Sequence, residues 1–250
     1  MRARLQKIFG YIVATLAVLL AWAFISLMID SPALPLPTAA IQQFVILLPD
    51  MLPHIWISLY RILISMALGT VFGTLLGLLI GRSAKLDMIG APLMYVLYPV
   101  PKIVFVPVLL VLLGLGNAPA IALMSTVIFF QTLVTARAAA KSIPADLVLS
   151  VRSLGASKLD LARHVVFPSA LPSIFTALRI SAGTAVAVLF VVESIAGNTG
   201  VGFYIVNAWG RIDYATMFAG IITMALMGVF LYEVINFIES KLVRWMPKPE

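Results

Sequence analysis

Several stretches of this chain run for about twenty residues without a charged side chain, which is the length that a helix needs to cross a bilayer. The first of them covers residues 8–29. Only 11% of all residues are charged, whereas a soluble domain carries roughly 25%. The mean hydropathy of +1.09 agrees with this balance. The sequence therefore predicts an all-α, polytopic membrane protein.

Six spans account for the apolar part of the chain. They are predicted at residues 8–29, 55–81, 88–115, 119–138, 173–195 and 214–238. The first resembles a signal peptide, but its apolar stretch exceeds the ~7–15 residues of a signal-peptide core, and no small-residue cleavage pattern follows it. We therefore expect a first transmembrane helix that is retained.

The basic residues are distributed unequally between the two ends of these spans. Thirteen of the 17 lie in segments on one side, namely Arg2, Arg4, Lys7, Arg82, Lys85, Arg137, Lys141, Arg152, Lys158, Arg163, Lys241, Arg244 and Lys248. The opposite segments hold only Arg211. Because loops rich in Lys and Arg remain in the cytoplasm, this asymmetry predicts that both termini and residues 142–172 are cytoplasmic.

This topology divides the chain into three parts. Residues 1–54 hold the first transmembrane helix and a periplasmic loop, residues 55–240 form the main transmembrane domain, and residues 241–250 form a cytoplasmic tail. The net charge of +7 is spread over short segments between apolar runs, a pattern of topology determinants rather than of a nucleic-acid surface. We expect membrane lipid and no nucleic acid as a partner. The absence of cysteine excludes disulfides and thiolate ligands.

Three glycines recur every fourth residue in the second predicted span. Gly69, Gly73 and Gly77 therefore lie on one face of a helix, where a neighbouring backbone can approach closely. Glycine is common in membrane helices in general, which explains the number of these residues but not their spacing. The spacing favours a helix-packing face.

The third predicted span is interrupted by four prolines, at positions 92, 99, 101 and 107. Proline removes a backbone donor and kinks a helix, and broken helices within a membrane occur where they are buried in protein or line a watery cavity. Lys102 lies among these prolines. We expect it to face an internal cavity, where it is the first candidate to contact an anionic solute.

Other charged residues also lie inside predicted spans, among them Arg61, Arg179 and Glu193. Arg61 and Arg179 lie near span ends, where a long side chain can extend its charge to the interface. Glu193 lies near the outer end of the fifth span and has no basic neighbour in the sequence. Two interpretations of Glu193 stay open: a residue of the outer gate or pathway, or a solvated helix end.

Residues 142–172 carry signals for two short helices. For the first helix, Ser142 is the expected N-cap, Pro144 lies in the first turn, and Leu147, Val151 and Leu154 form an apolar stripe. Such an amphipathic hairpin suits either lipid headgroups or a docking partner in the cytosol.

The second half of this segment begins with a turn. Gly155 fits the left-handed position after a helix, and Ser157 with Asp160 forms a capping-box start of a second helix. Pro168 is expected to end that helix. We therefore expect a structured helical hairpin rather than a flexible linker.

The spacing within this hairpin resembles the EAA loop of ABC-importer permeases, with its pattern E-A-A, three residues, Gly, nine residues, I-x-L-P. The corresponding positions are Leu149, Ser150, Val151, Gly155, Val165, Phe167 and Pro168. The Gly–Pro spacing holds, whereas the acid and both alanines are absent. The stretches "YPVPKIVFVPVLLVLLGLGNAP" and "VVESIAGNTGVGFYI" are similar to the nitrate/sulfonate/taurine-type branch of this family.

The resemblance implies a permease subunit in the bacterial inner membrane, with a type I ABC transmembrane domain at 55–240. It implies two ATPase subunits that bind ATP and Mg, a second and identical permease copy, and an extracytoplasmic solute-binding protein. This chain has no G-x-x-x-x-G-K-[ST] phosphate loop, so we expect no enzyme activity, cofactor or metal of its own. The residues expected to couple it to the ATPase are Ser153, Leu154, Gly155, Ala156, Ser157, Lys158 and Asp160.

Two other classes of protein are compatible with the composition. An ion-driven secondary transporter usually shows inverted repeats and ionisable residues at mid-membrane, and the sequence shows no clear repeat. A membrane scaffold that docks a cytosolic partner needs no cavity, whereas the proline-broken third span favours one.

Overall fold

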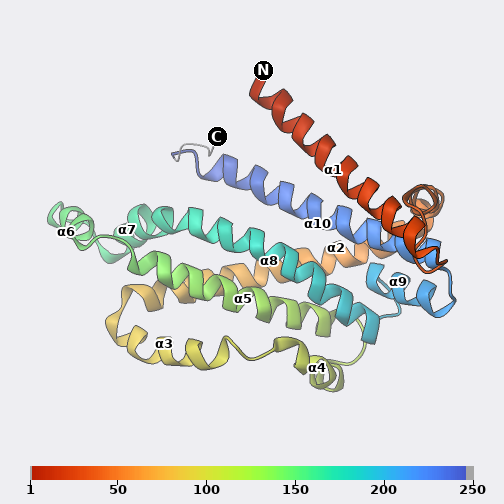
Figure 1. The fold of residues 1–250 in the computed structure, drawn as a ribbon. Helices are drawn as coiled ribbons and strands as arrows, with labels where there is room; N and C mark the ends of the chain where they lie inside the picture. Colours follow the sequence, from red (N-terminus) through yellow and green to blue (C-terminus); the bar gives the residue numbers. More distant parts are fainter. Residues whose placement is uncertain (1, 246–250) are drawn as a thin grey trace.

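The computed structural model describes residues 2–245, and the regular structure within this range is helical (Figure 1). The α-helices are α1 (Arg2–Ile29), α2 (Pro37–Arg82), α3 (Ala84–Leu97), α4 (Val106–Leu113), α5 (Asn117–Lys141), α6 (Ala145–Ser153), α7 (Lys158–Leu161), α8 (Phe167–Ala196), α9 (Val201–Gly210) and α10 (Tyr214–Leu242). A 3₁₀ turn covers Lys102–Phe105, and a π turn covers Ala162–Val166. Residues 246–250 of the expected cytoplasmic tail lie outside the described residues.

Five helices of the described chain are long and apolar enough to cross a membrane. A sixth candidate is the pair α3 and Lys102–Leu113, which is bent by 78° at its break. The predicted all-α, polytopic membrane fold is thereby confirmed, with these five helices and the bent pair as its candidate spans. The bend lies where Pro99 and Pro101 interrupt the helix, as expected for residues that cannot donate a backbone hydrogen bond.

The centre of the molecule is built from α2, α5, α8 and α10. Figure 1 shows α5 and α8 running side by side along the bundle, with α6 at one end and α9 at the other. We call these the hairpin end and the α9 end. The most deeply buried large side chains include Ile62, Met124, Ile128, Leu189 and Leu231.

Helices α2 and α5 approach each other closely along the glycine face. A Cβ atom on Gly73 would lie 2.6 Å from the carbonyl oxygen of Phe129, and one on Gly77 would lie 2.6 Å from that of Leu133. A Cβ on Gly69 would meet the carbonyl oxygen of Ser125 at 2.7 Å. Each of these positions therefore has room for hydrogen only.

Helix α2 is much longer than the predicted span 55–81, because it begins at Pro37. Most of the expected periplasmic loop in residues 1–54 is consequently helical. Figure 1 shows the first turns of α2 end-on, so the helix changes direction before it joins the bundle. Pro49 and Pro53 lie inside the helix. A proline inside a helix bends it without always ending it.

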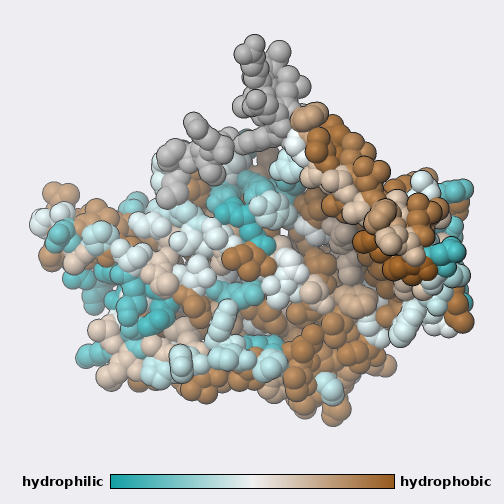
Figure 2. All heavy atoms as spheres, in the orientation of Figure 1, coloured by the Kyte–Doolittle hydropathy of each residue, from teal (hydrophilic) through white to brown (hydrophobic). Residues whose placement is uncertain are grey.

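Helix α1 stands apart from the bundle (Figure 1), and only 6% of its apolar span is buried. Figure 2 shows hydrophobic residues over α1 and α4, and hydrophilic residues gathered at the hairpin end. An apolar belt between two polar ends is the surface that a bilayer requires.

Candidate functional site

The hairpin end carries the turn that the sequence predicted between two short helices. Gly155 has a φ of +86°, and an added Cβ would have nothing within 4 Å. The capping box is present, because the Ser157 hydroxyl accepts the Asp160 N–H while the Asp160 carboxylate accepts the Ser157 N–H at 3.0 Å. The Ser157 hydroxyl also donates to the Asp160 carboxylate, and this bond, together with the one from the Ser157 N–H, holds the pKa of the Asp160 carboxyl below its ordinary value. The turn is thus held open to solvent by its own backbone and side chains.

The hairpin is anchored to the bundle on one side only. Val148, Leu161 and Val165 are buried in a small cluster with Ala140 at the end of α5. On the other side, Leu154 is 87% exposed, so the tip presents apolar side chains that nothing in the described chain covers. The other exposed leucines of the hairpin are Leu147, Leu149 and Leu159.

All seven residues that we expected to contact an ATPase lie in or beside this turn. Six of them are exposed and Ala156 is half-buried. Leu149, which replaces the acid of the family pattern, is also exposed. The hairpin therefore presents the predicted residues together on one surface.

The expected start of the first hairpin helix was wrong. Ser142 ends α5 instead of capping α6, and Pro144 itself takes the N-cap position. In the predicted apolar stripe, Leu147 and Leu154 are exposed, as a surface for lipid or a partner requires. Val151 instead packs against the small cluster around Val148, the buried residue of α6.

Pro168 does not end a helix, because the chain stays helical from α7 into α8. The Phe167 N–H donates to the carbonyl of Ala162, five residues earlier, in the π turn that precedes the proline. Proline cannot donate the backbone hydrogen bond to the carbonyl four residues before it, and its ring crowds that carbonyl. The wider π turn relieves that crowding, so α7 and α8 continue as one rod.

Lys102 lies at the break between α3 and α4. Its ammonium group donates to the carbonyl oxygens of Leu97, at 2.8 Å, and Tyr98, at 2.5 Å, and lies 4.6 Å from the centre of the Phe130 ring. The side chain borders a cavity of about 240 Å³ that Thr126 also lines. Lys102 thus stabilises the free carbonyls at the end of α3 and still faces a cavity.

Glu193 is fully buried near the α9 end, which excludes the solvated helix end that we had considered. Its carboxylate accepts hydrogen bonds from Arg61 Nη1 at 2.7 Å, from Ser58 Oγ at 2.8 Å and from the Gly202 N–H at 2.8 Å. The side chain of Arg61 is only 3% exposed. The interpretation of Arg61 as an interfacial residue was therefore wrong.

The Arg61–Glu193 pair is a feature that sequence reasoning missed. The two residues are 132 positions apart, and neither has an opposite charge nearby in the sequence. One signal was available in the sequence: a cation and an anion lie near the outer ends of two predicted spans. A buried charge needs a partner of opposite charge. A comparison of how far Arg61 and Glu193 lie from the ends of their spans would therefore have predicted that they pair.

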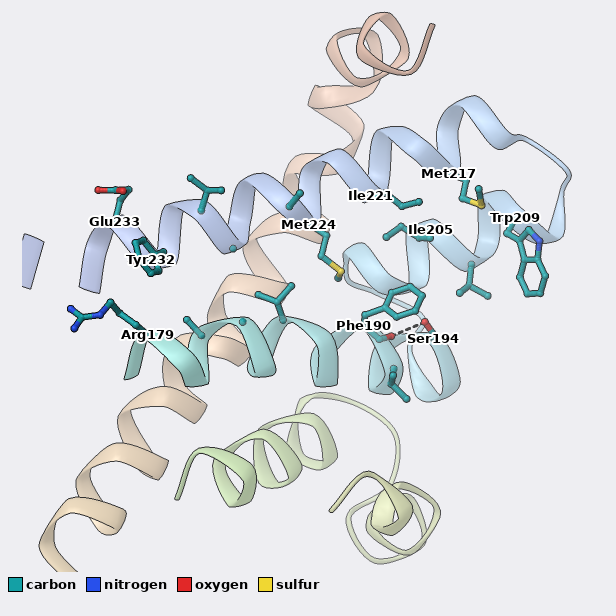
Figure 3. A pocket seen from close by; sticks show the side chains of 18 of the residues that line it. Arg179, Phe190, Ser194, Ile205, Trp209, Met217, Ile221, Met224, Tyr232 and Glu233 are labelled. Atoms are coloured by element: carbon teal, nitrogen blue, oxygen red, sulfur yellow. Dashed lines mark hydrogen bonds between the residues drawn. The ribbon is translucent and has the colours of Figure 1, made fainter. Parts of the chain in front are cut away.

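A large cleft lies between α8, α9 and α10, with Tyr11 and Thr15 of α1 also in its lining, and has a volume of about 1740 Å³. Figure 3 shows Trp209 at its α9 end and Arg179 with Glu233 at its other end. Arg179 forms an ion pair with Glu239 of α10. Between these ends the lining is mainly apolar and includes Val186, Phe190, Ile205 and Met224.

Comparison with known proteins identifies the family. The family model described as "Binding-protein-dependent transport system inner membrane component" matches residues 69–244, which include the glycine face, the hairpin and Glu193. The chain belongs to this family.

Relatives in this inner-membrane component family match most of the chain. The taurine transport system permease protein TauC of Escherichia coli (strain K12) is 29% identical over 93% of this chain and 88% of its own length. The putative aliphatic sulfonates transport permease protein SsuC of Bacillus subtilis (strain 168) is 28% identical over 87% and 79%. The nitrate import permease protein NrtB of Leptolyngbya laminosa is 28% identical over 74% and 67%.

A solved structure shares the fold of this family member. An inward-facing structure of the MetNI methionine ABC transporter superposes with a TM-score of 0.61 and 24% sequence identity, covering 78% of this chain and 97% of that one. The expected membership in the nitrate/sulfonate/taurine branch and the type I importer fold are confirmed.

Proposed function

We propose that this chain is the permease subunit of an ABC importer in the bacterial inner membrane, with the hairpin end in the cytoplasm. The observation that carries the proposal is the anchored hairpin with its exposed Gly155 turn, within a chain of this family. The hairpin is anchored on its inner side and exposes apolar side chains on its outer side. An exposed apolar surface of this kind suits contact with a partner protein better than contact with solvent. The partner is a cytosolic ATPase that binds ATP and Mg.

The hairpin joins that ATPase to the membrane helices. Since α7 continues into α8 without a loop, a displacement at the turn moves α8 directly. Two ATPase subunits act on two permease copies, and an extracytoplasmic solute-binding protein delivers the solute at the α9 end. The permease itself contributes no chemistry: it switches between two packings of its helices.

The second, identical copy is proposed to bind in the cleft between α8 and α10. Gly183 and Gly228 line it, and a Cβ on Gly183 would have nothing within 4 Å. Small residues on an open helix face allow another helix to approach closely. Tyr11 and Thr15 of α1 also line the cleft, but only 6% of the apolar span of α1 is buried, so α1 does not fill it.

The solute is proposed to be a small anion, of the kind that the names of the taurine, sulfonate and nitrate relatives specify. Lys102 supplies the positive charge: it lies inside a bent span, and its ammonium group faces a cavity. Two carbonyl acceptors leave one N–H of the ammonium for a ligand.

The ATPase contact is tested by Leu154→Asp in reconstituted transporter. Burying a leucine is worth about 1.5–3 kcal/mol, so the substitution should weaken ATPase binding roughly ten- to a hundredfold and abolish solute-stimulated hydrolysis. Leu86→Asp, an exposed leucine in the first turn of α3, is the matched control. Unchanged co-purification and hydrolysis in Leu154→Asp would contradict docking at this turn, and uptake without any ATPase would favour an ion-driven transporter.

The role of Lys102 is tested by solute uptake into vesicles. Lys102→Gln should lower uptake of an anionic solute at least tenfold, whereas Lys102→Arg should retain a measurable part of it, because the charge remains. Lys85→Gln removes a charge of the same kind outside the cavity and should have little effect. Equal uptake by Lys102→Gln and the parent protein would remove Lys102 from the pathway.

A further inference from the structure

The N-terminus of α9 is held by side chains from other helices instead of by residues of its own. The Gly200 N–H donates to His54 Nδ1 at 3.1 Å, and the Gly202 N–H donates to the Glu193 carboxylate at 2.8 Å. Between them, the Val201 N–H donates to Ser58 Oγ at 2.9 Å. The first backbone donors of a helix have no partner within it. Here α2 and α8 supply those partners.

Arg61 extends this arrangement to the start of α5. Its Nε donates to Asn117 Oδ1 at 2.8 Å, and its two Nη atoms donate to the carbonyl and the hydroxyl of Thr199 at 3.0 and 3.1 Å. With the bond to Glu193, four of its five N–H donors are engaged. One guanidinium thus joins α2, α5, α8 and the segment before α9.

The backbone of residues 200–202 packs closely against the carboxylate of Glu193. Gly200 has a φ of +108°, and a Cβ there would lie 2.3 Å from a carboxylate oxygen of Glu193. A Cβ on Gly202 would lie 2.8 Å from the Cβ of Glu193. No space remains beside the carboxylate for a solute molecule, and its oxygens already have partners. Direct contact between Glu193 and a transported solute is therefore incompatible with this arrangement.

We infer that Arg61 and Glu193 are positioning residues: they form a buried clasp that fixes α9 to the ends of α2, α5 and α8, so that these four elements move as one body. Helix α9 contributes Ile205, Val206 and Trp209 to the large cleft (Figure 3). The clasp thereby sets the position of one wall of the cleft. This inference deepens the proposed function by assigning the outer-gate candidate Glu193 a role that acts through α9.

The test uses the fact that the chain has no cysteine. Ala208 of α9 is fully buried, so a cysteine introduced there reacts with a thiol reagent only when α9 separates from the bundle. In the full-length protein in detergent, Glu193→Gln and Arg61→Met should each raise the labelling rate of Ala208→Cys at least tenfold. The rate at Ala170→Cys, a buried site near the hairpin end of α8, should not change.

The double variant Arg61→Met with Glu193→Gln tests whether the two residues act as one pair. Because either single substitution already breaks the clasp, the double variant should label Ala208→Cys no faster than the single variants. An unchanged rate in both single variants would overturn the inference, as would a double variant whose increase is the product of the two single increases. A variant that also exposes Ala170→Cys is judged by the ratio of the two labelling rates, which should still rise for Ala208→Cys.

The assay contains neither ATPase nor solute, so its result is independent of the proposed transport. If Glu193 contacted solute instead, labelling would stay at the parent rate while uptake was lost in every Glu193 variant, the double variant included. If only the ABC assignment failed, the labelling pattern would still follow the clasp.

Discussion

Gly155 and Gly200 both have a positive φ, but their surroundings differ. Gly155 lies at an exposed turn where an added Cβ would meet nothing within 4 Å. Gly200 faces the carboxylate of Glu193 at a distance that no Cβ can occupy. The first position is restricted by backbone conformation alone, and the second by conformation and space together.

The residue-scale prediction follows from this contrast. Gly155→Ala should cost about 1–2 kcal/mol of local stability from its left-handed backbone. Gly200→Ala adds a steric clash and should cost roughly 2–5 kcal/mol in total. Thermal unfolding of the detergent-solubilised protein, followed by circular dichroism, measures the difference. Equal unfolding midpoints for the two variants would contradict the tight packing around Glu193.

At the scale of the helices, the α2–α5 contact depends on glycine more than on side-chain packing. Three carbonyl oxygens of α5 lie within 2.7 Å of the places where the side chains of Gly69, Gly73 and Gly77 would begin. Membrane helices gain little from burying apolar groups, since lipid is equally apolar, so close backbone contact provides much of the attraction between them.

The element-scale prediction compares two glycines. Gly73→Val should separate α2 from α5 and leave little folded protein after extraction. Gly183→Trp, in the open cleft, should leave the fold intact and shift the mass measured by light scattering from dimer to monomer. A stable Gly73→Val protein would contradict the first expectation. A dimeric Gly183→Trp protein would place the second copy elsewhere.

On the scale of the whole molecule, the fold could be predicted largely from hydropathy, because a bilayer imposes a fixed helix length. The turn at Gly155 and the capping box could be predicted because their signals are local. The Arg61–Glu193 clasp could not, since it depends on which helices are neighbours. The start of α2 at Pro37 was missed for another reason: Pro49 and Pro53 look like loop residues in the sequence.

The whole-molecule prediction concerns the two ends of the bundle. A cysteine at Leu154, at the hairpin end, should react with a membrane-impermeant reagent only in inside-out vesicles. A cysteine at Ile212, which is 72% exposed beyond α9, should react only from the opposite side, in spheroplasts. The reverse pattern would mean that the chain is inserted with the hairpin outside and would exclude a cytosolic ATPase as its partner.

The uninterrupted path from Lys158 to Ala196 has a mechanical consequence. These 39 residues form one helical rod, roughly 60 Å long at 1.5 Å per residue. A tilt of this helix by one degree about the hairpin displaces its α9 end by about 1 Å. A rotation of a few degrees, imposed where a partner grips the turn, would therefore shift Glu193 and the whole of α9 by several ångströms.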